Sequence, residues 1–260
     1  MPGLIVRREG PIGTLIFSNV ARHNAMTYAM WHEYPRLLRE LDADADVRVI
    51  VLCGDGDKAF VSGADISQFE QTREEEGMQE AYNRALVTAY SAPSHCAKPV
   101  IAKIRGFCMG GGLGLAAGCD IRIAADNARF RMPAARMGLG YAFPGVQRFV
   151  ALMGPANAAD IFFTARDFDA ADAHRMGFVQ RVTRPDDLDA VVAEYCNVIA
   201  ANAPLAVACA KRSIVEASLD QDVRDMSAVD ALIEAAGDSE DHKEAGAAFL
   251  AKRKPLFKGQ

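Results

Sequence analysis

Several features that this sequence lacks narrow the classes of protein it can belong to. No stretch reaches the ~18 uninterrupted apolar residues of a transmembrane helix, so no membrane partner is expected. The net charge is −5 and no basic patch dominates, which argues against a nucleic-acid partner. Residues 1–13 lack the apolar core of a signal peptide, and the sequence therefore predicts a cytoplasmic protein.

Cysteine pairs and metal-ligand spacings are also missing. The six cysteines form no C-x-x-C pair and have no histidine partners at ligand spacing. Buried, reduced thiols explain them best, and we expect no metal site.

The composition that is present indicates one sizeable core. Half of the 260 residues are hydrophobic and 24% are charged. Apolar strand-like runs alternate with helical segments, which favours an α/β core with parallel strand pairs. Mostly helical sequence follows position 154, and we place the boundary between a core (1–200) and a C-terminal helical part (201–260) near residue 200.

The stretch Lys98–Asp120 organises the chain. Pro99–Ile104 predicts a buried strand, Gly106 and Gly110–Gly112 a turn, and Leu113–Ala117 a buried helix that ends at Gly118. Glycines let a ligand approach the backbone closely, and a helix start leaves N–H groups unpaired. Such a turn is suited to stabilising a developing oxyanion.

Three other interpretations of this glycine turn fit the sequence less well or equally well: a phosphate-binding loop, a dinucleotide-binding turn and a turn that serves packing alone. A phosphate loop is excluded because no Gly-Lys-Ser/Thr follows the glycines. A dinucleotide fingerprint, Gly112-x-Gly114-x-x-Ala117, lacks the acidic ribose partner expected about 20 residues later. A turn that only lets a helix pack on a sheet stays open.

The rest of the chain predicts further elements around this one. A hairpin is expected at 4–8 and 12–18, a helix capped by Thr27 up to Asp42, and strands at 47–53, 59–66 and 120–125. Helices are expected at 68–92, 156–165, 169–176, 186–202, 204–218 and 221–258, with a short strand at 178–182.

Several segments match one family pattern in the right order. They are Arg22–Met26, Phe60–Ile66, Lys98–Val100, Gly106–Gly112, Cys119–Asp120, Gly177–Val179, Ala203–Leu205 and Ala248–Gly259. Over essentially its whole length the chain resembles the crotonase (enoyl-CoA hydratase/isomerase) superfamily. The resemblance implies a spiral of ββα units, a C-terminal trimerisation part and an acyl-CoA thioester ligand.

The resemblance also assigns roles to individual residues. It places the family's oxyanion hole on the backbone N–H groups of Ala64 and Gly111. It implies a homo-oligomer, trimer or dimer of trimers, and no cofactor beyond the CoA moiety of the substrate. For CoA binding it points to Arg22, Ala25, Ser62, Asp65, Ile66, Phe249 and Lys252, the last two acting on a neighbouring subunit's site.

The chain departs from the family at the two catalytic glutamates. Gly114 stands at one of those positions and Ala134 at the other. Between Lys98 and Val150 the only carboxylates are Asp120, for which the resemblance implies a structural role, and Asp126. We therefore expect weak hydration of simple enoyl-CoA substrates.

Other polar residues are candidates for the missing groups. Tyr141 is the best substitute acid or base, although packing against the acyl chain would also explain it. Arg131 and Arg136 are candidates for pairing with a substrate carboxylate, or for surface ion pairs. The remaining candidates are expected to be solvated or to pack structurally: Glu70, Glu74, Glu75, Glu76 and His95.

Three functions compete at this stage. The first is an acyl-CoA lyase, hydratase or isomerase with non-standard acid/base groups. The second is a decarboxylase or hydrolase acting on a CoA thioester. The third is a non-catalytic acyl-CoA-binding protein; RNA binding is disfavoured because helix 27–42 has no lysine-rich face.

Overall fold

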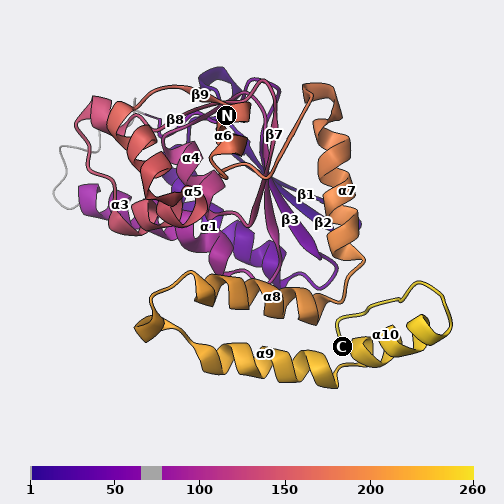
Figure 1. Ribbon diagram of the computed structural model, residues 1–260. Helices are drawn as coiled ribbons and strands as arrows, with labels where there is room; N and C mark the ends of the chain where they lie inside the picture. Colours follow the sequence, from indigo (N-terminus) through magenta and orange to yellow (C-terminus); the bar gives the residue numbers. More distant parts are fainter. Residues whose placement is uncertain (1, 66–77) are drawn as a thin grey trace.

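Two sheets of unequal size make up the core of the computed structural model, which describes residues 2–65 and 78–260 (Figure 1). The larger sheet has the order β1-β2-β3-β5-β7-β10 and the smaller one the order β4-β6-β8-β9. Strands β1 (Gly3–Glu9) and β2 (Ile12–Ser18) form the antiparallel hairpin predicted from the sequence. The remaining pairs of the larger sheet are parallel, as the alternation of strands and helices predicted.

The chain places strands in the two sheets alternately. The larger sheet receives β3 (Val49–Gly54), β5 (Val100–Ile104), β7 (Ile121–Ala125) and β10 (Arg181–Thr183). The smaller sheet receives β4 (Ala59–Val61), β6 (Phe107–Met109), β8 (Arg129–Arg131) and β9 (Phe168–Asp169). This alternation produces the spiral of ββα units expected from the family resemblance, and the α/β fold is confirmed.

Strand β3 shows why the larger sheet is covered on both faces. Ile50 and Leu52 belong to the main core, whereas Val49 and Val51 contact a second, smaller cluster. Helix α7 (Leu188–Ala200) covers that second cluster with Leu188, Val192 and Cys196. Residues that alternate along a strand point to opposite faces, so an uninterrupted apolar run corresponds to a strand buried on both sides.

Helices of the first half pack around the main core. Helix α1 (Tyr28–Ala43) begins where Thr27 accepts a hydrogen bond from the Met30 N–H, as predicted, and buries Trp31 and Tyr34. Helices α3 (Met78–Ser91), α4 (Gly111–Gly118), α5 (Phe143–Thr164) and α6 (Ala170–Arg175) complete this part. Backbone angles at Gly154 (φ 77°, ψ 161°) are not helical, so α5 is kinked there.

The C-terminal helices extend from one side of the core (Figure 1). They are α8 (Pro204–Ala217), α9 (Met226–Asp238) and α10 (Glu240–Leu250). The single helix predicted at 221–258 is therefore wrong, because Ser239 leaves the helical conformation and its hydroxyl caps α10 at the His242 N–H. No single described helix is long and apolar enough to cross a membrane. The bent helix pair 185–200 and 204–217 reaches the length and hydropathy of a membrane span only when its two parts are counted together.

Candidate functional site

Three neighbouring parallel strands end at one edge of the smaller sheet. β4 pairs with β6, and β6 pairs with β8, all in the same direction. Parallel strands bring the segments that follow them to the same edge, where α/β proteins commonly bind ligands. Those segments are Ser62–Asp65, Gly110–Gly111 and Met132–Ala134, so residues far apart in sequence meet at one place.

The turn after β4 leaves the N–H of Ala64 pointing away from Met26, the residue with which this turn pairs. Met26 donates to the carbonyl of Gly63 at 2.8 Å and accepts from the Asp65 N–H at 2.9 Å. In this parallel pairing the N–H of Ala64, between those two residues, points to the opposite side. No hydrogen-bond acceptor for the Ala64 N–H is found in the described part of the chain.

The turn after β6 presents a second amide beside the first. Gly110 has φ 50° and its N–H donates to the Arg131 carbonyl at 2.9 Å, so the chain turns directly into α4. Gly111 is the first residue of that helix, and its N–H likewise has no acceptor among the described residues. A Cβ built on Gly63 would lie 3.8 Å from the Gly111 nitrogen, so the two turns are neighbours.

The glycines of the second turn also serve close packing. A Cβ on Gly112 would lie 2.0 Å from the Val61 carbonyl oxygen, and one on Gly111 would lie 3.0 Å from the Trp31 ring. The packing interpretation of this turn therefore holds for Gly112. At Gly110 the positive φ explains the glycine, because L side chains avoid that conformation.

Four residues predicted to contact CoA lie together. Ser62 donates its hydroxyl hydrogen to the Arg22 carbonyl at 3.0 Å, and Arg22 Nη1 pairs with Asp65 Oδ1 at 2.7 Å. Ala25 is buried between Asn24 and Met26 in the same loop. Ile66, Glu70, Glu74, Glu75 and Glu76 lie outside the described residues.

The other two predicted CoA contacts lie apart from this group. Phe249 is 84% exposed near the end of α10, and Lys252 follows that helix. Figure 1 shows α10 at the far end of the C-terminal arm formed by α8, α9 and α10, away from β8 and β9 of the smaller sheet. This placement is compatible with the expected contact to another subunit, which stays a prediction.

Gly114 and Ala134, the two positions at which the family resemblance predicts catalytic glutamates, carry no acidic side chain. A Cβ on Gly114 would lie 2.7 Å from the Tyr141 hydroxyl and from the Tyr90 ring, so these two tyrosines occupy that space. Ala134 is half-buried just beyond Pro133, whose ring would lie 3.6 Å from a Cβ on Gly110. Asp120 makes structural contacts: it accepts a hydrogen bond from the Val100 N–H at 2.7 Å and pairs with Lys211 at 2.8 Å.

Tyr141 is held inside an aromatic group. Its ring contacts Phe162 and Phe149 edge-on, with centroids 5.3 Å and 6.3 Å away, and stacks on Tyr90 at 6.2 Å. Its hydroxyl is buried and has no partner with hydrogen-bond geometry among the described residues. Burial raises the pKa of Tyr141, although the adjacent Tyr90 hydroxyl opposes this, so the phenol stays neutral at physiological pH.

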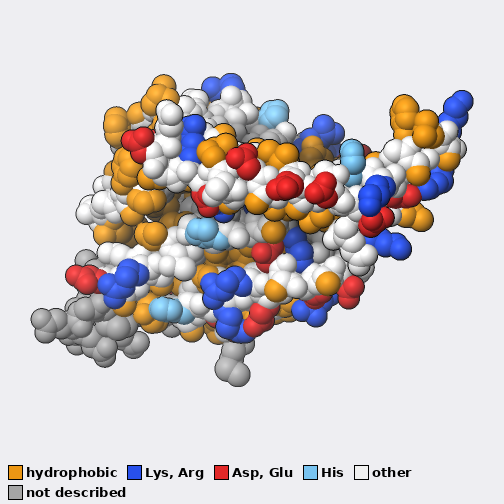
Figure 2. Space-filling model, turned by 90° about the horizontal axis from the view of Figure 1, so that it is seen from below, with side chains coloured by type: hydrophobic (Ala, Val, Ile, Leu, Met, Phe, Trp, Pro, Cys, Tyr) orange, Lys and Arg blue, Asp and Glu red, His pale blue; other side chains and the backbone are white. Residues whose placement is uncertain are grey.

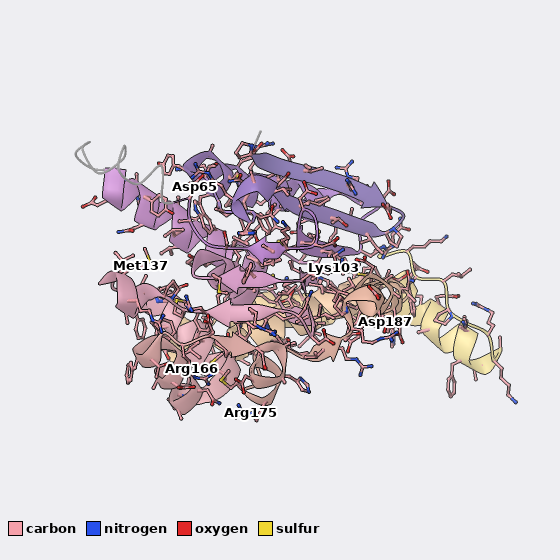
Figure 3. All side chains as sticks on the ribbon, turned by 90° about the horizontal axis from the view of Figure 1, so that it is seen from above. Asp65, Lys103, Met137, Arg166, Arg175 and Asp187 are labelled. Carbon is pink, nitrogen blue, oxygen red and sulfur yellow. The ribbon has the colours of Figure 1, made fainter. Side chains whose placement is uncertain are left out.

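Two arginines considered for substrate pairing have different surroundings. Arg131 forms an ion pair with Asp167, which supports the surface ion-pair interpretation for this residue. Arg136 is exposed in the short helix Ala134–Met137 that borders the site. In Figure 3, Met137 at the end of this helix lies towards the same end of the molecule as Asp65, away from Lys103 and Asp187.

Two cavities of the described residues lie outside these turns. One, of about 180 Å³, is lined by residues that include His23, Asp57 and Lys58. The other, of about 170 Å³, lies between Arg48, Lys98 and the start of α8. The candidate site is assigned from the two turns and their amides, and neither cavity is part of that assignment.

The fold and these paired glycine turns define the class of the protein: an α/β enzyme of the crotonase fold. The sequence profile of the enoyl-CoA hydratase/isomerase family matches residues 7–260, and the chain belongs to that family. It is therefore an enzyme of the enoyl-CoA hydratase/isomerase family.

Relatives of known name cover nearly the whole chain. A short-chain-enoyl-CoA hydratase from Clostridium acetobutylicum is 35% identical over 96% of this chain and 95% of its own length. A crotonyl-CoA hydratase from Syntrophomonas wolfei is 32% identical over 98% and 97%. The crystal structure of an enoyl-CoA hydratase/carnithine racemase from Magnetospirillum magneticum has a TM-score of 0.93 and 36% identity, and covers 100% of this chain and 97% of that one.

Proposed function

We propose that this enzyme holds the carbonyl oxygen of an acyl-CoA thioester between the N–H groups of Ala64 and Gly111. The observation that supports this is the meeting of two glycine turns whose amides have no acceptor among the described residues. A thioester carbonyl gains negative charge when an enolate or tetrahedral adduct forms, and one fixed donor is worth about 3 kcal/mol to such a state. The acid/base groups that complete the reaction are non-standard, because Gly114 and Ala134 cannot transfer protons.

Decarboxylation or hydrolysis of an acyl-CoA is the second candidate reaction, and decarboxylation has the stronger support. Loss of CO₂ from a carboxylate next to the thioester produces an enolate directly, so it needs the oxyanion hole but no general base. The two tyrosines that fill the space at Gly114 favour it over hydration, since a buried neutral phenol is a poor base.

Parallel assays distinguish these reactions. Hydration of crotonyl-CoA and decarboxylation of malonyl-CoA are measured on the same preparation, together with calorimetric binding of acetyl-CoA. Binding with turnover in either assay supports the proposal, and binding without turnover favours a non-catalytic acyl-CoA-binding protein. A protein that binds none of the three thioesters would contradict the proposed site.

Replacing Arg22 by alanine is expected to weaken CoA binding about tenfold, or ~1.4 kcal/mol. The Arg22 guanidinium is more than half exposed and pairs with Asp65, and a guanidinium is a good partner for a CoA phosphate. Titration calorimetry with CoA measures the change. Arg36→Ala is the matched control, because it removes the same charge from an exposed ion pair on α1; equal affinity in both variants would exclude Arg22 from the CoA site.

We also propose that the enzyme is a homo-oligomer, a trimer or a dimer of trimers, built through residues 201–260. Large apolar side chains lie exposed on the C-terminal arm, among them Phe249 (84%), Leu250 (83%) and Leu256 (76%). Figure 2 shows hydrophobic side chains gathered at the far end of this arm, over α10. Exposed apolar groups of this kind are typical of surfaces that another protein covers.

Sedimentation velocity at micromolar concentration tests this assembly. We expect a species of three or six subunits, which Phe249→Glu together with Leu250→Glu shifts towards smaller species by placing charge in the apolar contact. Val87→Glu, on an exposed apolar residue of α3, is the control. A wild-type protein that sediments as a monomer would contradict the assembly.

A further inference from the structure

Three glycines form a stripe along one face of α4, and Tyr90 lies lengthwise over it. Gly111, Gly114 and Gly118 are spaced three and four residues apart, so they share a helix face. A Cβ on Gly118 would lie 2.2 Å from the Tyr90 carbonyl oxygen, and one on Gly114 would lie 2.7 Å from the Tyr90 ring. One on Gly111 would lie 3.2 Å from the Tyr90 hydroxyl, which therefore reaches the first turn of the helix.

Tyr141 approaches the same stripe at Gly114. Its hydroxyl would lie 2.7 Å from a Cβ on Gly114, and its ring is packed 2.4 Å from the Cβ position of Gly145. The hydroxyl is buried, and it interacts with the hydroxyl of Tyr90, whose influence on the pKa of Tyr141 opposes that of burial. The two phenols are therefore coupled to each other beside the first turns of α4.

The two tyrosines form a stacked pair beside the proposed oxyanion hole. Their rings are almost parallel, at 11°, with centroids 6.2 Å apart. Both side chains are only half-buried as a whole, although the Tyr141 hydroxyl is not accessible. Gly111, whose N–H is the proposed carbonyl donor, is the residue that the Tyr90 hydroxyl adjoins.

Burial also keeps both phenols protonated. It raises the pKa of Tyr90 well above its ordinary value, and the charge of a neighbouring Tyr141 would raise it further. A neutral phenol donates a hydrogen bond or a proton. The pair is therefore suited to delivering a proton, and unsuited to removing one from carbon.

We propose that Tyr90 is a catalytic residue that delivers a proton to the α-carbon of the thioester enolate, that Tyr141 supports it, and that the substrate is an α-carboxylated acyl-CoA. This inference rests on the proposed oxyanion hole and names the substrate class for it. The sequence analysis did not single out Tyr90, because its position on α3 gives no sign that its hydroxyl reaches α4.

The step balances without any further cofactor. The bond between the α-carbon and the carboxylate breaks, CO₂ leaves, and its electron pair forms the enolate, whose oxygen accepts from Ala64 and Gly111. The enolate then collapses, the α-carbon forms a bond to the phenolic hydrogen of Tyr90, and the thioester carbonyl returns. Tyr141 donates to the phenolate oxygen of Tyr90, which regains a proton from water.

Decarboxylation of 2-methylmalonyl-CoA in deuterium oxide tests this step. The wild-type enzyme is expected to give 2-deuteropropionyl-CoA of one configuration, because a fixed donor protonates one face of the enolate. Tyr90→Phe is expected to lower turnover about 10²–10⁴-fold and to give mixed configurations. Tyr141→Phe is expected to lower turnover with the configuration kept, and acetyl-CoA affinity is expected to change less than twofold in both variants.

A buried tyrosine elsewhere provides the matched control. Tyr34→Phe removes a hydroxyl that is also buried and unpartnered among the described residues, but on α1; its turnover is expected to match the wild type. Unchanged turnover or unchanged configuration in Tyr90→Phe overturns the inference. A wild-type protein that binds acetyl-CoA but does not decarboxylate 2-methylmalonyl-CoA also overturns the inference. A wild-type protein that binds no thioester contradicts the proposed oxyanion hole instead.

Discussion

Crotonyl-CoA is expected to be hydrated by the wild-type enzyme far below the ordinary enzymatic rate of about 10 s⁻¹. Adding water to an enoyl group needs one residue to activate the water and another to protonate the α-carbon. Each such group contributes about 10²–10⁴-fold, and neither Gly114 nor Ala134 carries a side chain that transfers protons. The loss of absorbance of the enoyl thioester measures the rate directly. Turnover of about 10 s⁻¹ or more would mean that the acid/base pair comes from elsewhere in the chain.

Introducing glutamates at positions 114 and 134 is not expected to create a hydratase in this fold. Gly114→Glu together with Ala134→Glu would raise hydration only if the pocket had room for both side chains. The structure removes that room, because even the Cβ of residue 114 would lie 2.7 Å from Tyr90 and Tyr141. Overpacking of this kind costs about 1–3 kcal/mol, so the double variant is expected to lose stability and to gain no hydration. A large gain would show that the two tyrosines move aside readily.

Lys211→Met is expected to lower the free energy of unfolding by about 3–5 kcal/mol, because it leaves buried partners without a cation. Lys211 is 6% exposed on α8, and its ammonium group pairs with Asp120 at 2.8 Å. It also donates to the carbonyls of Pro93 and Lys98, at 2.7 Å and 2.8 Å. The variant therefore leaves the Asp120 carboxylate without its cation and removes the ammonium donor from two carbonyl oxygens where α8 meets the core.

Urea titration of the wild type and two variants measures this effect. Lys243→Met is the matched control, since its ammonium group pairs with Glu240 on the exposed surface of α10. Exposed pairs contribute about 0–1 kcal/mol, so the control is expected to stay close to the wild type. Equal losses in the two variants would show that burial of Lys211 adds nothing to its ion pair.

Local patterns were sufficient to locate most elements of the fold. The β1–β2 hairpin, the Thr27 cap and the strand–turn–helix around Gly110–Gly112 follow from residue spacing and turn chemistry, which act over a few neighbours. The cysteine interpretation is also confirmed, since all six are free and only Cys209 is not fully buried. Strands β6, β8 and β9 were missed because each has only two or three residues, too few for a periodic signal.

Two other errors concern the boundaries of elements. The predicted helix at 221–258 was too long because the break at Ser239 depends on one cap rather than on a proline. The strand predicted at 178–182 lies at 181–183 instead, where it pairs with β7. Phe178 precedes this strand and packs in the main core. Pairing with a distant strand sets such boundaries, and the local sequence does not contain that information.

By itself the sequence determined the glycine turns, the absence of acidic side chains at positions 114 and 134, and, through order and spacing of motifs, the family. Only the tertiary structure decided what fills the space beside Gly114. Tyr90 and Tyr141 are 51 positions apart and belong to different segments, yet both hydroxyls reach one face of α4. Local spacing fixes backbone turns, whereas contacts between distant side chains depend on how helices pack, and no pattern of neighbouring residues records that packing.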